Sequence, residues 1–193
     1  MYQKRNNDLV ILGLYSGNYA KRFYLREISK IAKLPLKTTQ TVLEKLEKNR
    51  IIKSLVQGKN KYFMLNLENI ETKLYLIQTE IHKTLFFIYK YPLFKPFIKE
   101  IKNTSAPIIV FGSFAKFKAE KNSDTDILVI SKDKLDLPFH VLPYKIHEIN
   151  LSEKEFMKGI ETRETLVKEI EENHIILNNY CFFVNKMWGE YAR

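Results

Sequence analysis

The sequence predicts an α+β protein with two parts, of which the first is basic and combines helices with a hairpin, and the second combines buried strands with helices. Three observations support this prediction. Apolar residues recur with helical spacing between positions 7 and 49, and two β-type runs then flank the turn Gln57-Gly58-Lys59-Asn60. Farther along, Ile108–Phe111 and Ile127–Ile130 have the length and apolar composition of buried strands.

The net charge of +10 lies entirely in the N-terminal third of the chain. Residues 1–66 contain 14 Lys and Arg but only 4 Asp and Glu, whereas residues 67–193 contain 18 of each kind. A domain with such an excess is suited to binding a polyanion, so DNA is the predicted partner of residues 1–66. The alternative is a protein-docking module whose lysines form a solvated surface.

The order of predicted helices and strands in this basic part is similar to that of a known type of domain. Helical spacing runs over Leu25–Ala32 and Lys37–Asn49, which the turn Leu34-Pro35 separates, and the hairpin follows. This order over residues 1–66 resembles a winged helix-turn-helix domain, as does the fragment LREISKIAKLPLKTTQTVLEKLEKNRIIKSL. The resemblance implies that the second helix enters the major groove and that the hairpin is the wing. The DNA contacts that it implies are Lys37, Thr38, Thr39, Gln40, Lys59 and Lys61.

Residues 67–104 are predicted to form a helical connector between the two parts. An apolar stripe runs along it for about six turns, until Tyr91-Pro92 ends the helix. The stripe consists of Ile70, Leu74, Ile77, Ile81, Leu85 and Ile88. Two interpretations stay open: the stripe packs against the body of the same chain, or it joins two chains in a homodimer.

The segment PIIVFGSFAKFKAEKNSDTDILVI, residues 107–130, carries the residues suited to catalysis. Gly112 lets a ligand approach the backbone closely, and Ser113 offers a hydroxyl at the start of a helical stretch, where anions are favoured. Asp124 and Asp126 open the second strand and, because side chains alternate along a strand, project from the same face. Two neighbouring carboxylates repel each other, so they usually require a cation between them.

This arrangement resembles the signature of the polymerase-beta-like nucleotidyltransferases, and most closely that of their small members. The resemblance implies that residues 105–193 form a mixed sheet flanked by helices. It implies that Asp124 and Asp126 bind Mg²⁺ or Mn²⁺ and are catalytic, and that the substrate is ATP or another nucleoside triphosphate. The nucleotide-binding residues that it implies are Gly112, Ser113, Lys116 and Ser123. The sequence departs from the family pattern at Lys116-Phe117, where many small members have Arg-Gly.

The family usually supplies a third carboxylate from a later strand, which here is YKIHEINL, residues 144–151. Glu148 is the only acid in this strand and is predicted to be the third catalytic residue. Since neighbouring residues point to opposite faces of a strand, His147 is the alternative. If Glu148 faces the aspartates, three carboxylates can hold the metal ions and an enzyme is favoured. If His147 faces them, a second metal ion is held only weakly.

Two functions follow from these interpretations. The first is a DNA-binding nucleotidyltransferase that transfers AMP to a hydroxyl. In related small proteins the acceptor can be a partner toxin, which would make this protein an antitoxin that represses its own operon. The second is a non-catalytic transcriptional regulator whose transferase domain senses a nucleotide or docks a partner.

Two further expectations concern the environment of the protein. A charged N-terminus without a signal-like apolar run, and no stretch near the ~20 apolar residues of a membrane span, predict a cytoplasmic protein without a membrane partner. The single cysteine, Cys181, excludes an internal disulfide framework and a cysteine-based zinc site. Its aromatic neighbours predict a buried thiol.

Overall fold

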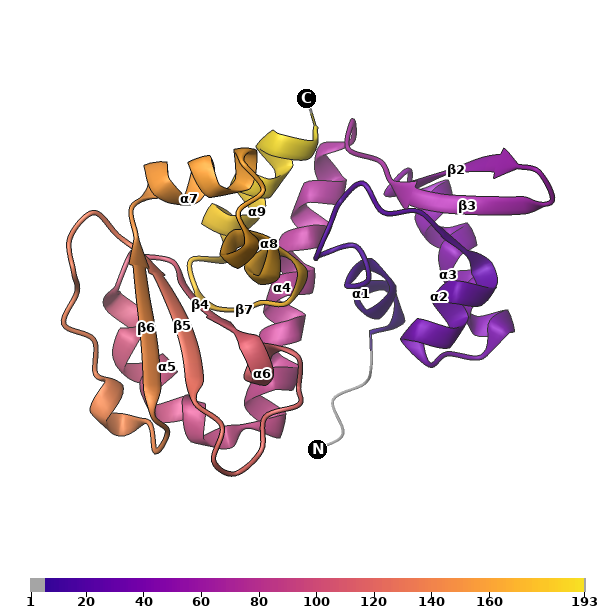
Figure 1. Ribbon diagram of the computed structural model, residues 1–193. Coiled ribbons are helices and arrows are strands. Elements are labelled where there is room, and N and C mark those ends of the chain that lie inside the picture. The colour runs from indigo at the N-terminus through magenta and orange to yellow at the C-terminus, as the bar shows by residue number, and fades with distance from the viewer. Residues whose placement is uncertain (1–5, 193) are drawn as a thin grey trace. The chain divides into compact units, whose positions relative to one another are not determined.

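The computed structural model describes residues 6–192, whose contacts divide the chain into two compact units (Figure 1). The first unit contains residues 6–79 and 184–192, and the second contains residues 80–183. Both divisions fall inside helices, namely α4 (Ile70–Lys90) and α9 (Tyr180–Tyr191). The predicted boundaries at residues 66 and 104 therefore do not coincide with the division that the contacts give.

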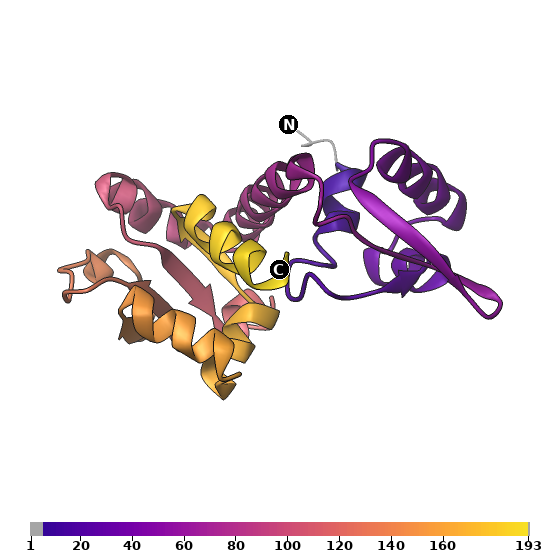
Figure 2. The same cartoon turned by 90° about the horizontal axis from the view of Figure 1, so that it is seen from above.

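Besides its parts of α4 and α9, the first unit contains the helices α1 (Asn7–Leu12), α2 (Leu25–Ala32) and α3 (Leu36–Lys48) and a small antiparallel sheet. The strands β1 (Phe23–Tyr24), β2 (Ile52–Gln57) and β3 (Asn60–Leu65) follow the order β1-β3-β2. Figure 2 shows the β2–β3 hairpin projecting beyond the helices of this unit. At its tip Gly58 adopts a φ of +61°, which a tight hairpin turn favours.

The second unit contains a mixed four-stranded sheet of order β6-β5-β4-β7. Its strands are β4 (Ile108–Phe111), β5 (Thr125–Ile130), β6 (Ile146–Leu151) and β7 (Ile175–Asn178). β4 is antiparallel to β5 and β7, whereas β5 and β6 are parallel. The helices of this unit are α5 (Lys95–Glu100), α6 (Gly112–Ala115), α7 (Glu153–Glu161) and α8 (Thr165–Glu172), with short 3₁₀ turns at Pro92–Phe94, Ile101–Asn103 and Phe139–Val141. The prediction of a mixed α+β fold is confirmed for this part.

The central strands of this sheet are buried on both faces. On β5, Ile127 and Val129 pack in the core that contains Phe87, Phe94 and Phe97. Leu128, which lies between them, projects from the opposite face and is also fully buried. Asp126 shares the side of Leu128 because side chains alternate along a strand. The strand therefore presents its carboxylate on the face opposite the Phe87 core.

Two details of the helices differ from expectation. Cys181 is exposed, so the prediction of a buried thiol is wrong. In this turn of α9 it is Phe183 that is fully buried, and Cys181 lies two residues away on another side of the helix. Within residues 6–192, no helix combines the length and apolar character that crossing a bilayer requires.

Candidate functional site

Gly112 joins β4 to α6 and lies directly against the carboxylate of Asp126. The antiparallel register pairs Phe111, the last residue of β4, with Asp126, and Gly112 follows Phe111 directly. Gly112 has a φ of +67°, and a Cβ atom at this position would lie 2.2 Å from Asp126 Oδ2. Both the backbone conformation and the lack of space therefore require glycine here.

The parallel register of β5 and β6 determines which residue of β6 accompanies Asp126. It pairs Asp126 with His147 and Ile127 with Glu148. His147 Nδ1 lies 3.1 Å from Asp126 Oδ1, within hydrogen-bonding distance. Of the two alternatives left open by the sequence, His147 is thus the residue beside the aspartate.

Glu148 does not lie with this group, contrary to the prediction that it supplies a third catalytic carboxylate. It shares the sheet face of Ile127, which belongs to the Phe87 core. Its Oε2 atom lies 4.0 Å from Lys134 Nζ, and its Oε1 atom is buried without a hydrogen-bond partner. The physical reason is the strand period of two, which turns adjacent residues to opposite faces.

Asp124 precedes β5 and is more exposed than Asp126, with 48% of its side-chain surface accessible against 27%. Its Oδ2 atom accepts a hydrogen bond of 3.1 Å from Lys145 Nζ, just before β6. Across residues 6–192, no three His, Cys, Asp or Glu side chains are arranged to hold a metal ion. Asp124 and Asp126 supply the oxygen ligands that a divalent cation prefers, whereas the two-ion set that the resemblance implies stays an expectation.

The residues predicted to bind the nucleotide are held in different ways. Ser113 lies in the first turn of α6, next to Gly112. Lys116 Nζ donates to Glu169 Oε1 at 2.6 Å, so α8 supplies a carboxylate that the sequence did not reveal. The Ser123 hydroxyl accepts the backbone N–H of Glu120 at 2.8 Å and closes a turn before Asp124.

Phe117 stands where many small nucleotidyltransferases have glycine, and it retains the backbone conformation that glycine favours. Its φ is +56°, a region that bulky residues rarely occupy. Its ring stacks on Tyr91 with centroids 6.2 Å apart and meets Phe87 edge-on at 6.3 Å. Ring packing thus offsets the backbone strain at this departure from the family pattern.

In the first turn of α3, some of the predicted DNA-binding side chains are exposed to solvent and others are buried. Lys37 and Gln40 are exposed, and Thr38 is partly buried. Thr39 is fully buried, and its hydroxyl donates to the Pro35 carbonyl at 3.1 Å. The prediction that Thr39 contacts DNA is therefore wrong, because its side chain faces the core of the unit.

A hollow of about 760 Å³ lies between α3 and the hairpin, and charges of both signs line it. Lys59 and Lys61 line it as the predicted wing residues, and Arg26 adds a cation that the sequence reading missed. Glu44 and Glu47 line it from α3, and Glu47 pairs with Lys61 at 2.8 Å. Part of the positive charge of the hairpin is thus already neutralised within the unit.

Comparison with known proteins gives a family match for part of the second unit. Residues 95–180 match the model of the family described as "Polymerase beta, Nucleotidyltransferase". The match supports a nucleotidyltransferase domain in this part of the chain. It includes Gly112, Asp124, Asp126 and His147, whose arrangement is described above. No curated protein and no solved structure matches the chain significantly.

Proposed function

We propose that the protein transfers a nucleoside monophosphate, AMP from ATP, to a hydroxyl acceptor and releases pyrophosphate. The observation that supports this most directly is Asp126, held between Gly112 and His147 within the region that matches the nucleotidyltransferase family. Gly112 leaves open backbone at the start of α6, and Asp124 adds a second carboxylate just before β5.

Each of these residues has a role in the proposed reaction. Asp124 and Asp126 would hold one divalent cation, Mg²⁺ or Mn²⁺, which when bound neutralises charge on the triphosphate. Ser113 would donate hydrogen bonds to phosphate oxygens, and Lys116 would add a positive charge beside them. His147 is the neighbouring group able to accept the proton of the attacking hydroxyl.

The proposal is tested by transfer of label from ATP carrying radioactive α-phosphate. The full-length protein, Mg²⁺ or Mn²⁺ and a cell lysate as the source of acceptors are incubated together. We expect a labelled product that disappears with the double variant Asp124→Ala and Asp126→Ala. Absence of label transfer with either metal ion would contradict the proposal.

One observation favours a second candidate function, a non-catalytic regulator that senses a nucleotide or docks a partner. The site offers a carboxylate pair without a third carboxylate, and Lys145 already partly neutralises Asp124. On this alternative, ATP binds to the protein without transfer. Calorimetric titration with ATP separates the two candidates, because the regulator gives a binding isotherm but no labelled product.

We also propose that residues 6–66 form a winged helix-turn-helix domain that binds DNA. The order of α1, α2, α3 and the β2–β3 hairpin supports this, as do the exposed Lys37 and Lys59. Because Glu44 and Glu47 line the hollow beside α3, we expect DNA contacts at the first turn of α3 and at the hairpin tip. Phosphate contacts would dominate the affinity and make it strongly dependent on salt.

The acceptor in this proposal is a tyrosine hydroxyl of a partner toxin, which transfer would silence in the cytoplasm. Only the family resemblance supports this choice of acceptor. The labelled product identifies the acceptor directly, because mass spectrometry of the labelled band locates the modified residue. Label on RNA or on a small molecule would contradict the antitoxin role while leaving the transferase activity intact.

A further inference from the structure

Strand β6 and the residue directly before it place a partner beside each aspartate of the candidate site. In the parallel register of β5 and β6, Asp126 pairs with His147. One step earlier on both strands, the Thr125 N–H donates to the Lys145 carbonyl at 2.8 Å. Lys145 therefore lies beside Asp124, and its Nζ atom is 3.1 Å from Asp124 Oδ2. Residues two apart on a strand share a face, so Lys145 and His147 belong to one row.

Lys145 contacts an oxygen atom that a divalent cation needs. Mg²⁺ and Mn²⁺ bind through carboxylate oxygens, whereas Asp124 Oδ2 accepts a hydrogen bond from the Lys145 ammonium group. Positive charges a few ångströms apart repel each other, so it is unfavourable for an ammonium group and a divalent cation to share this carboxylate. Binding of a cation to Asp124 and Asp126 therefore favours movement of the Lys145 side chain away from Asp124.

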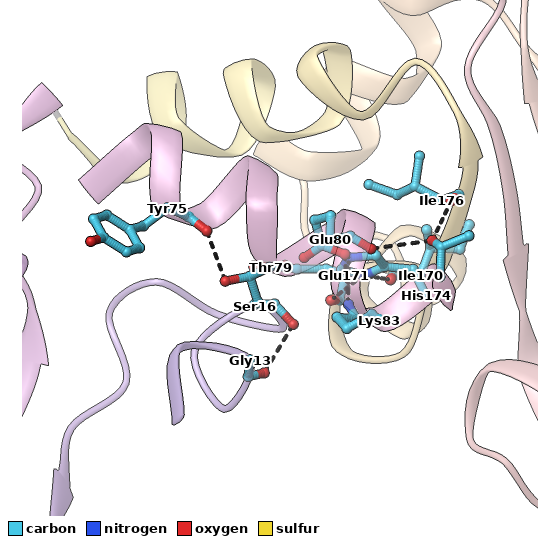
Figure 3. Close-up of polar contacts among 11 residues, drawn as sticks. Gly13, Ser16, Tyr75, Thr79, Glu80, Lys83, Ile170, Glu171, His174 and Ile176 are labelled. Atoms are coloured by element: carbon cyan, nitrogen blue, oxygen red, sulfur yellow. Dashed lines mark hydrogen bonds and ion pairs between the residues drawn. The ribbon is translucent and has the colours of Figure 1, made fainter. Parts of the chain in front are cut away.

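The Lys145 side chain can move without a large loss of stability. It is 81% exposed, and the side chain of Asp124 is 48% exposed. An exposed ion pair contributes little to stability because water solvates both groups. The Glu80–Lys83 pair of α4 differs, since its carboxylate is only 1% exposed (Figure 3). The contact between Lys145 and Asp124 is thus one that a ligand can replace.

An ammonium group released from Asp124 can bind a phosphate. Lys116, the other lysine that we assign to the triphosphate, already donates to Glu169 of α8 at 2.6 Å. Lys145 loses its contact with Asp124 when a cation binds there, so its charge becomes available to a phosphate oxygen close to that cation.

We propose that Lys145 is a further residue of the transfer site and exchanges one partner for another. Without a divalent cation its ammonium group binds Asp124, and when a cation binds Asp124 and Asp126 it binds an oxygen of the triphosphate. The inference rests on the proposed function, because it requires a cation on these aspartates. By linkage, the cation and the nucleoside triphosphate each bind more tightly in the presence of the other, and Lys145 carries part of this coupling.

Binding of Mn²⁺ to the full-length protein without nucleotide tests the first part of the proposal. Electron paramagnetic resonance of free Mn²⁺ gives the dissociation constant without any measurement of transfer. Lys145→Met keeps an unbranched side chain but removes the charge, and should bind Mn²⁺ about tenfold more tightly than wild type. Lys145→Arg keeps the charge and should bind Mn²⁺ as wild type does.

The matched control for the charge is Lys134→Met. Lys134 also lies between β5 and β6 and its side chain is 80% exposed, but its nearest carboxylate is Glu148 at 4.0 Å, on the opposite face of the sheet. Its replacement removes the same net charge and should leave the Mn²⁺ affinity unchanged.

Titration with an ATP analogue tests the second part, at saturating Mn²⁺. The analogue carries a methylene group between the α- and β-phosphorus atoms, so it binds without transfer. Lys145→Met should weaken its binding about tenfold, because one charged hydrogen bond to phosphate is lost, whereas Lys134→Met should not.

Two results would overturn the proposal while the proposed function stands. They are an equal Mn²⁺ affinity of wild type and Lys145→Met, and binding of the analogue that Lys145→Met leaves unchanged. Failure of both proteins to bind Mn²⁺ would instead overturn the proposal together with the proposed function.

Discussion

Gly112 leaves no room for a side chain beside Asp126, since a Cβ atom there would lie 2.2 Å from Oδ2. Gly112, the first residue of α6, thus leaves the space that the Asp126 carboxylate on β5 occupies. It also shows that the Gly-Ser and Asp-x-Asp motifs, which are separated in sequence, form one structural group.

Gly112→Ala should therefore impair nucleotide transfer more than folding. The new methyl group would displace the Asp126 carboxylate, and a misplacement of about 1 Å can cost roughly 100-fold in rate. Label transfer from ATP measures this loss, and thermal unfolding measures the accompanying change in stability. Gly189→Ala is the matched control, because nothing lies within 4 Å of its added Cβ atom, and it should retain wild-type transfer.

His147 and Glu148 should differ sharply in their effects on transfer. His147→Ala removes the group beside Asp126 and should lower the transfer rate about 100-fold or more, as expected for a general base. Glu148→Gln changes a carboxylate on the opposite face and should leave transfer close to wild type. Initial rates at saturating Mg²⁺ make the comparison. The reverse pattern would show that the strand register assigned to β6 is incorrect.

The variant His147→Asp tests in a different way whether residue 147 faces the cation. A carboxylate facing Asp126 would supply the third oxygen ligand that the wild-type site lacks, and hard cations such as Mg²⁺ prefer oxygen ligands. We expect Mg²⁺ to bind this variant more tightly by calorimetry, by about tenfold. An unchanged Mg²⁺ affinity would indicate that residue 147 does not face the cation.

The basic unit should bind DNA mainly through phosphate contacts. Replacing both Lys37 and Lys59 by Ala should reduce the slope of log affinity against log salt by about 0.9 for each lost contact. Fluorescence anisotropy with duplex DNA at several salt concentrations measures this slope. Lys102→Ala, an exposed lysine of the second unit, is the control and should keep the wild-type slope. If the double variant also keeps that slope, DNA does not bind where we propose.

Glu80 should make the stability of the second unit dependent on pH. Burial alone would raise the pKa of Glu80, but the charges and hydrogen bonds of Lys83 and His174 lower it from 4.5 to about 2. Because the folded pKa lies below the unfolded value, the ionised carboxylate stabilises the fold above about pH 4.5. This contribution is lost as the pH falls toward 2.

Glu80→Gln tests this contribution by urea unfolding at two pH values. At pH 7 the variant should lose about 3–5 kcal/mol, because it leaves Lys83 without its buried counter-charge and His174 without a carboxylate partner. Near pH 3 the difference from wild type should shrink. Glu161→Gln alters an exposed carboxylate of the same unit and should change the free energy of unfolding little at either pH. An equal loss at both pH values would argue against an ionised Glu80.

Several local features could be read from the sequence because they depend on short segments. The apolar runs at Ile108–Phe111 and Ile127–Ile130 form strands as predicted, and Gly58 lies in a hairpin tip. Gly112 lies against Asp126 because β4, which ends at Phe111, pairs directly with β5, a strand close to it in the chain.

Other features depend on which face of an element meets the core, and periodicity does not specify that face. On α4, Glu80 and Thr84 face inward and contact His174 and Ile176, whereas Leu74 and Leu85 of the apolar stripe are exposed. Thr39 lies in the exposed-looking opening of a helix, yet its side chain faces inward. Lys116 gains Glu169 from a helix about fifty residues later in the chain.

The sequence by itself placed Gly112, Ser113, Asp124 and Asp126 between two apolar strand segments, and the excess of positive charge in residues 1–66. Only the tertiary structure decided that His147 rather than Glu148 accompanies Asp126, and that Glu80 and Thr84 of α4 face inward. The reason is physical. A shift of one residue in strand register, or a rotation of half a turn in a helix, leaves local preferences unchanged but exchanges the side chains that meet.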